Sequence, residues 1–237
     1  MKVLKLALCA AAASLAMATG AAAQDAVTAP DVSFNVGVAS DYVFRGISQT
    51  NEDPQIFGGV DMVADIFYAG AWASNVDFGD ETDAEYDLYA GVTPTIGPVA
   101  ANFGIIYYGY VGAPDGPEYD YVEFKAAGSV PVGPASVGLA TYFSPEFFGE
   151  TGEAWYTEGN ASFSPMENLT LSGAYGHQYI DLADDYDTWN LGATYAFLER
   201  LSVDVRYHDT DLDDCSICDE RVVATLKATF PYVSLPE

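Results

Sequence analysis

Residues 189–207 read WNLGATYAFLERLSVDVRY and contain two segments in which apolar side chains recur at every second position. Asp204 and Arg206 fall on the opposite phase of the second segment. Strict alternation is typical of a β-strand with one apolar and one polar face. Because only 198–200 separates the segments, they predict two antiparallel strands joined by a tight turn. The apolar phase consists of Trp189, Leu191, Ala193, Tyr195, Phe197, Leu201, Val203, Val205 and Tyr207.

The same alternation recurs along the chain, giving about twelve predicted strands between Ser33 and Phe230. The first is expected over 33–45. The third is expected to place Tyr68, Trp72 and Phe78 on its apolar phase. Charged side chains fall on the polar phase of these segments, where acids outnumber bases, and we expect them to line an interior. They are Asp41, Arg45, Asp61, Asp65, Asp77, Glu85, Asp87, Glu123, Lys125, Glu158, Asp204, Arg206, Arg221 and Lys227.

Short and long connections alternate between the predicted strands. The short ones lie at 66–68, 93–98, 130–134, 164–168 and 198–200, and the long ones at 46–54, 79–84, 109–118, 144–152, 178–186 and 209–220. Aromatic side chains end the apolar face at both levels, which is typical of the girdles of an outer-membrane barrel. Those near the long loops are Tyr42, Phe44, Phe78, Tyr107, Phe143, Trp155, Trp189 and Tyr207, and those near the short turns are Tyr68, Phe163, Phe197 and Phe230.

Two all-β architectures separate apolar and polar faces in this way. A secreted β-sandwich does so, but it needs neither the alternation of loop lengths nor two aromatic belts. We therefore expect a single transmembrane, antiparallel, up-and-down β-barrel of about twelve strands. An even strand count returns both termini to the periplasmic side. A count of ten would favour a filled interior.

The N-terminus predicts export. Lys2 and Lys5 precede an apolar run over 6–17, and Ala21 to Ala23 supply small residues for cleavage before Gln24. We therefore expect a cleaved signal peptide over 1–23, a short periplasmic segment over 24–31, the barrel over 32–230 and a C-terminal tail over 231–237. The tail is expected because Pro231 cannot donate to a strand ladder.

Composition excludes a generic nucleic-acid binder. The 237 residues carry 35 acids against 8 lysines and arginines, for a net charge of −27, and phosphate binding needs a basic surface. His177 and His208 lie beside no recognisable nucleophile motif, so we expect no enzyme and no catalytic residue. No cofactor or metal site is expected either. Cys215 and Cys218 form a lone C-x-x-C that predicts a local disulfide in an exported loop, with metal capture beside the neighbouring aspartates as the alternative.

Four stretches carry a resemblance to a known family: VASDYVFRGISQT at 38–50, PQIFGGVD at 54–61, YAGAWASNVDFG at 68–79 and EYDLYAG at 85–91. They resemble the TorF-type porin family of proteobacterial outer-membrane proteins, which was earlier defined as a family of unknown function. The match covers roughly the first quarter of the mature chain, and later strands match only in style. The resemblance implies an outer-membrane barrel and a diffusion channel.

These observations together predict an outer-membrane porin of a Gram-negative bacterium. We expect passive diffusion of small hydrophilic solutes or ions, with a cation preference set by the acidic lining. The alternative is a non-conducting barrel whose acidic outer loops act in adhesion, ligand binding or divalent-cation binding. Expected partners are outer-membrane lipid and lipopolysaccharide and no nucleic acid; a homo-oligomer is left open. The sequence leaves the choice between an open and a plugged lumen undecided.

Overall fold

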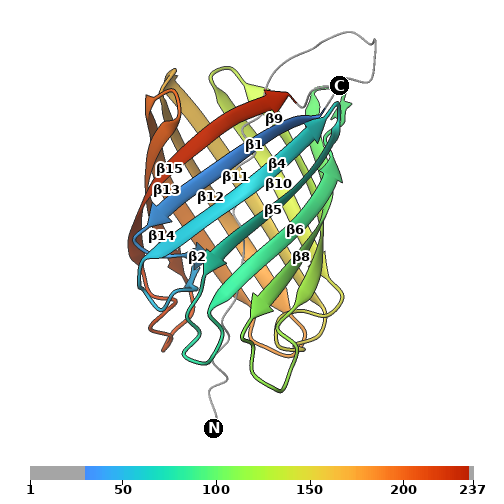
Figure 1. Cartoon of the computed structure of the whole chain (residues 1–237), viewed down its shortest axis with the longest axis vertical. Helices are drawn as coiled ribbons and strands as arrows, with labels where there is room; N and C mark the ends of the chain where they lie inside the picture. The colour runs from blue at the N-terminus through green and yellow to red at the C-terminus, as the bar shows by residue number, and fades with distance from the viewer. Residues whose placement is uncertain (1–29, 235–237) are drawn as a thin grey trace.

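The computed structural model describes residues 30–234 (Figure 1). The predicted signal peptide, nearly all of the predicted periplasmic segment and residues 235–237 lie outside the described residues. Among the described residues, no helix is both long enough and apolar enough to cross a membrane. The strands are β1 (Asp31–Ala39), β2 (Val43–Phe44), β3 (Ile47–Ser48), β4 (Gln55–Ala64), β5 (Phe67–Asn75), β6 (Ala84–Val92), β7 (Thr95–Ile96), β8 (Val99–Val111), β9 (Tyr121–Val132), β10 (Ala135–Ser144), β11 (Ala154–Met166), β12 (Leu169–Ile180), β13 (Tyr186–Leu198), β14 (Leu201–Thr210) and β15 (Arg221–Ser234).

Twelve long strands close into an antiparallel barrel, which confirms the predicted fold. Around the ring they follow the order β1, β4, β5, β6, β8 and then β9 to β15. The first and last strands close it, and β15 lies beside β1 in Figure 1. β7 pairs with the start of β8, while β2 and β3 form a separate hairpin. Closure leaves no unpaired edge along the ring.

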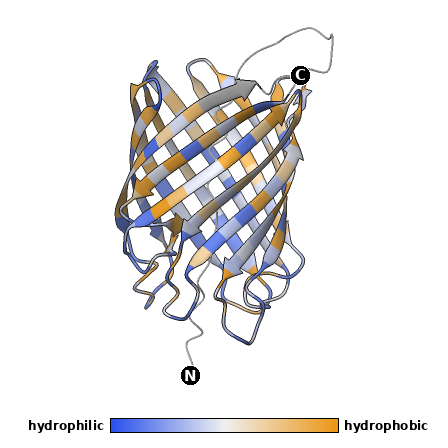
Figure 2. Ribbon diagram, viewed as in Figure 1, coloured by the Kyte–Doolittle hydropathy of each residue, from blue (hydrophilic) through white to orange (hydrophobic). Residues whose placement is uncertain are grey.

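Side chains alternate between the two faces of this wall, and Figure 2 shows hydrophobic and hydrophilic residues following one another along the strands. On β13 and β14, Leu191, Phe197 and Val205 face outward and are exposed, as their phase predicts. Asp204 and Arg206 face inward, where they pair with each other. The wall therefore has an apolar outer surface and a polar lumen, as a membrane barrel requires.

The connections separate into two ends. We call the six long ones L1 (40–54), L2 (76–83), L3 (112–120), L4 (145–153), L5 (181–185) and L6 (211–220). They gather at the lower end in Figure 1, the loop end. The short turns lie at the opposite, turn end, at 65–66, 93–98, 133–134, 167–168 and 199–200. Asp31, the first residue of β1, pairs at the turn end with Ser234, the last residue of β15.

The first strand is shorter than predicted. β1 ends at Ala39, and the chain then turns into the barrel instead of continuing to Arg45. Tyr42 and Phe44 are consequently buried inside the loop end and do not belong to the lipid-facing belt. The cause is local: the hairpin of β2 and β3 redirects the chain within a few residues.

The predicted phase of the third strand is wrong. In β5, Tyr68 and Trp72 face the lumen, and Ala69 and Ala71 face outward. Tyr68 donates a hydrogen bond to Asn102 across the lumen face, and the ring of Trp72 packs edge-on against Tyr42. The turn at 65–66 sets this phase, because β5 starts at Phe67 with that side chain exposed. Phe78, assigned to the same strand, belongs to L2 and packs on Phe148.

The last strand also differs from the expectation. β15 continues past Phe230 to Ser234, and Val233 and Ser234 of the expected tail pair with β1. The register shifts between Val32 and Phe34, opposite Pro231. A bulge accommodates a proline, which has no N–H for the ladder.

Apolar packing inside the barrel concentrates at the loop end. The cluster joins the L1 hairpin, L4 and L6 to the inner faces of the strands. Its buried members are Phe44, Ile47, Tyr108, Tyr110, Tyr121, Phe147, Phe148, Ala154, Ile180, Tyr186 and Cys218. We call it the loop-end cluster. It holds several of the long connections against the wall and gives the loop end a fixed shape.

Candidate functional site

L1 folds into the lumen and forms the first part of the candidate site. Its hairpin turns at Arg45 and Gly46, whose φ angles of 44° and 86° are both positive. Two such residues in a two-residue hairpin define a type I′ turn, in which glycine is favoured. The neighbouring side chains also leave no room here, because a Cβ on Gly46 would lie 2.2 Å from Cγ2 of Thr210 and 2.6 Å from Oγ1 of Thr188.

The base of L1 is tied to the loop-end wall. Asp41 accepts hydrogen bonds from the hydroxyl groups of Ser48 and Thr50, at 2.6 and 2.9 Å. Arg221 of β15 pairs with Asp41 at 3.0 Å and with Glu52 at 3.4 Å. These contacts hold the start and the end of L1 together against β15.

Neighbouring loops support L1 through the backbone. The amide of Ser48 donates to the carbonyl of Ile217 in L6 at 2.8 Å, and the amide of Asp77 in L2 donates to the carbonyl of Gln49 at 2.8 Å. L6 is closed by the disulfide between Cys215 and Cys218, so the predicted pairing is present in the structure.

The side chain of Arg45, at the tip of L1, reaches across the lumen and contacts the opposite wall. Its Nη2 atom lies 2.8 Å from Oε2 of Glu123 on β9, and its Nη1 atom donates to Oε1 of Gln178 on β12 at 2.8 Å. Its guanidinium also lies over the rings of Tyr142 on β10 and Tyr156 on β11, with centroid distances of 5.2 and 4.2 Å. Aromatic faces attract a guanidinium electrostatically. All four partners belong to consecutive strands of one wall.

A second acidic group faces the lumen from β6. Glu85 and Asp87 are two positions apart on the inward face of that strand, while Tyr86 and Leu88 between and beyond them are exposed outward. The hydroxyl of Tyr42, from L1, donates to Glu85 at 2.9 Å. L1 therefore contacts acidic residues on two different walls.

In the half of the lumen nearest the turn end, the residues between the charged groups have short side chains. Asp61 accepts a hydrogen bond from Tyr89 at 2.6 Å. Asp204 pairs with Arg206 at 3.1 Å, and Arg206 also donates to Asn190. Small and polar residues occupy many of the inward positions between these groups. They include Gly70, Gly91, Gly104, Ala127, Ser129, Gly138, Ser172, Ala174 and Gly192.

All but two of the residues predicted to line the interior lie on the inward face of the wall or on L1. Asp65 is in the turn between β4 and β5, and Asp77 is in L2; both are exposed. They miss the lumen because β4 ends at Ala64 and β5 at Asn75.

The sequence interpretation overlooked four residues around Arg45: Tyr108, Tyr142, Tyr156 and Gln178. Tyr108 donates to Glu123 at 3.0 Å, and the others contact Arg45 directly. Each lies on the polar phase of its strand. A search for aromatic residues on the polar phase would have found the tyrosines.

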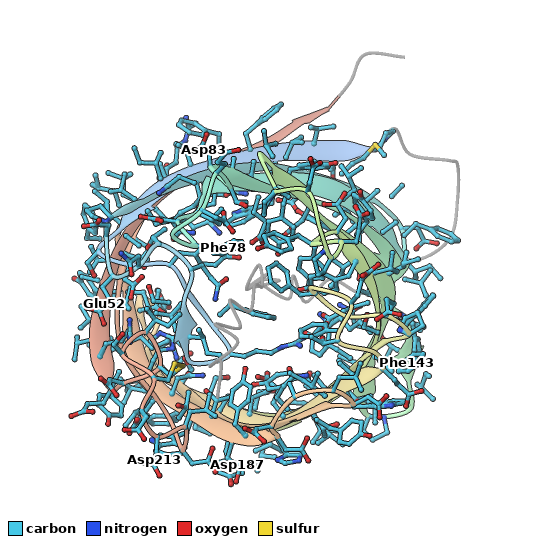
Figure 3. The ribbon with its side chains drawn as sticks, turned by 90° about the horizontal axis from the view of Figure 1, so that it is seen from below. Glu52, Phe78, Asp83, Phe143, Asp187 and Asp213 are labelled. Atoms are coloured by element: carbon cyan, nitrogen blue, oxygen red, sulfur yellow. A yellow bond between two sulfur atoms is a disulfide. The ribbon has the colours of Figure 1, made fainter. Side chains whose placement is uncertain are left out.

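At the loop end, polar partners of aromatic side chains face outward. Asp187 accepts hydrogen bonds from Tyr175 at 2.5 Å and pairs with His177 at 2.7 Å, and Tyr207 donates to Asp209 at 2.6 Å. Figure 3, viewed from the loop end, places Asp187 and Asp213 at the rim and Phe78 inside the ring. His177 is thus a surface residue. In the part of the chain that the structure describes, no three His, Cys, Asp or Glu side chains form a group that could hold a metal ion.

The closed wall, its apolar outer face and its charged lumen define a porin-type β-barrel. Solved structures share this fold: the KdgM porin superposes with a TM-score of 0.55 at 10% sequence identity, covering 84% of this chain and 98% of that one. The NanC porin gives a TM-score of 0.55 at 7% identity, with 84% and 98% covered.

Residues 23–235 match the model of a family described as a bacterial protein of unknown function, Gcw_chp, and the chain belongs to this family. No match is found among curated proteins. A KdgM porin in complex with disordered oligogalacturonate has a TM-score of 0.56 at 9% identity, covering 86% of this chain and 98% of that one.

Proposed function

We propose that the protein is a diffusion channel of the Gram-negative outer membrane that passes small hydrophilic solutes and prefers cations. The closed barrel with a charged lumen is the observation that carries the proposal. An antiparallel barrel with an apolar exterior satisfies its backbone within a bilayer and leaves a polar interior for solutes. The sequence resemblance to TorF-type porins and the shared fold of solved porins support the same location and role.

The cation preference is proposed from the charge balance of the lumen. Three of its bases are paired with acids, namely Arg45 with Glu123, Arg206 with Asp204 and Arg221 with Asp41. Lys125 interacts electrostatically with Glu158, and Lys227 with Asp61. Glu85 and Asp87 on β6 are two further inward-facing acids, and both are fully buried. The loops L2 to L6 at the mouth of the barrel are rich in Asp and Glu and hold no lysine or arginine. Excess carboxylates at the mouth and in the lumen concentrate cations and repel anions.

This charge pattern argues for a substrate class different from that named for one structural neighbour. Oligogalacturonate, the ligand of the KdgM complex, is a polyanion. We propose that this lumen excludes polyanions and admits neutral or cationic solutes. Lipid and lipopolysaccharide contact the outer face in this proposal, with the outward carboxylates at the loop end facing the headgroups.

A liposome-swelling assay tests the proposal with solutes of matched size and different charge. Purified protein is reconstituted, and swelling is measured with a neutral sugar, an amino sugar and a sugar acid. We expect permeation in the order cationic, neutral, anionic. Swelling equal to that of protein-free liposomes for every solute would refute the channel and favour the non-conducting barrel. Preferential entry of the sugar acid would refute only the cation preference.

A further inference from the structure

We infer that L1 is a constriction element latched across the lumen and that Arg45 is the positioning residue that holds it there. The inference rests on the proposed function, because it assigns to L1 the control of the path through the barrel. It goes beyond that function by naming the residue that fixes the width of the path.

The contacts of L1 span the barrel from one side to the other. L1 leaves the wall between β1 and β4, which are neighbours. In a ring of twelve strands, β10 and β11 stand opposite this pair, and β9 and β12 flank them. The side chains outside L1 that hydrogen-bond to Arg45 or stack on it come from these four strands. The contacts of Arg45 therefore join the origin of L1 to the diametrically opposite wall.

The acidic residues on either side of the L1 hairpin pair with a different arginine. Asp41 and Glu52 flank the hairpin on L1 itself and would be local acids for Arg45. Both instead pair with Arg221 of β15. Arg221 therefore holds the base of L1, and Arg45 holds its tip.

The backbone at the tip of L1 adopts an uncommon conformation. Arg45 has a φ of 44°, which lies in the left-handed region that residues other than glycine rarely adopt. Such a conformation persists where surrounding contacts determine it. Gly46 beside it contacts Thr188 and Thr210 so closely that no side chain fits. The tip is held from two directions, by Arg45 toward β9 to β12 and by Gly46 toward β13 and β14.

The ion pair between Arg45 and Glu123 is buried. The Arg45 and Glu123 side chains are only 5% and 2% exposed, and the guanidinium uses a second nitrogen for Gln178. Charge-assisted hydrogen bonds at buried sites are strong, and removal of one partner leaves the other charge unpaired. Loss of Arg45 should release the tip from β9 to β12, while Arg221 and the contacts to L2 and L6 keep the base in place.

Single-channel recording of three variants tests the latch. R45Q removes the bridge and one positive charge, whereas E123Q removes the same bridge and one negative charge. R206Q is the matched control, since Arg206 is also a lumen arginine but pairs with Asp204 on its own strand. We expect a larger and noisier conductance for R45Q and for E123Q, with an increase of roughly two-fold, because a released loop obstructs the path less. R206Q should shift ion selectivity, because it too removes a lumen charge, but it should not give the two-fold larger and noisier conductance.

R45Q and E123Q change the lumen charge in opposite directions. Comparing them therefore distinguishes an effect of the width of the path from an effect of its charge. Ion selectivity should shift in opposite directions in R45Q and E123Q, while conductance rises in both. The double variant R45Q/E123Q should add little to either single variant, because both break one contact. Unchanged conductance in R45Q, or an equal change in R206Q, would overturn the latch.

A second measurement does not depend on conduction. Hydrogen exchange of the L1 amides in lipid nanodiscs should accelerate over 43–49 in R45Q and stay at the wild-type rate in R206Q. If the wild type fails to conduct but this difference is observed, the proposed channel fails and the latch stands as a structural device. If exchange over 43–49 is the same in all proteins, the latch fails whatever the conductance shows.

Discussion

Arg45 in the first outer connection and Glu123 on β9 form an ion pair with 2.8 Å between Nη2 and Oε2, although 78 residues separate them in the chain. This pair joins opposite sides of a closed barrel. The cross-section available to a solute at this level is therefore determined by a loop as well as by the number of strands. A twelve-stranded wall alone would not reveal that obstruction.

The acid that faces the lumen from β4 should contribute to cation preference. Asp61 lies on the inward face, where Tyr89 hydrogen-bonds to it. Replacement by Asn removes one negative charge from the lumen, so the reversal potential in a potassium chloride gradient should shift toward the non-selective value. Asp65→Asn is the matched control, because the same charge is removed from an exposed turn. Equal shifts in the two variants would show that Asp61 does not line the ion path.

Gly46→Ala should strain the L1 tip in two ways. Its φ of 86° disfavours a side chain, and the added Cβ would contact Thr210 and Thr188. We expect a cost of about 1–3 kcal/mol, seen as a lower midpoint of urea unfolding or as faster amide exchange over 43–49. Gly149→Ala is the control, since its φ is 71° and its Cβ would meet no atom within 4 Å. If both variants behave alike, close packing at the tip is not important.

Removal of the L6 disulfide should loosen L1 without unfolding the barrel. The ring between Cys215 and Cys218 is short, so chain entropy predicts a loss of only about 2 kcal/mol. The ladder of twelve strands does not depend on that bond. We expect a Cys215→Ser/Cys218→Ser variant to keep the wild-type circular dichroism and to exchange the Ser48 amide faster, because its acceptor, Ile217, lies inside the ring. Loss of β-structure would contradict the expectation that the disulfide stabilises L1 and not the barrel.

Charge should be tolerated on one face of β13 and not on the other. Leu191 is 67% exposed and faces outward, whereas Thr194 faces inward and donates to Asp204. Leu191→Arg should destabilise the protein in lipid by about 2–4 kcal/mol near the bilayer centre. Thr194→Arg places the same charge beside Asp204 and should cost less. Equal folding yields of the two variants in lipid vesicles would argue against an outer face in contact with hydrocarbon.

The sequence was sufficient to predict the barrel, because alternation and loop lengths are local signals. It was insufficient for the phase of β5, where aromatic residues alternate with alanine and either set can face lipid. The inward course of L1 was also missed, since Tyr42 and Phe44 continue the apolar phase of β1 up to the turn at Gly46.

Most of the charged lumen residues were identified from phase alone. Their pairing was not, because Arg45 and Glu123 meet only after the ring closes. No local pattern encodes a contact across the whole barrel. Asp65 and Asp77 were assigned to strands that end before reaching them.

Single-channel recording of the wild-type protein in a planar bilayer, under a potassium chloride gradient, tests the central claim most directly. We predict stepwise openings with a reversal potential of the sign expected for cation preference. A correctly folded, heat-modifiable protein that gives no openings would contradict the channel, and openings with an anion-selective reversal potential would contradict the role of the acidic lumen.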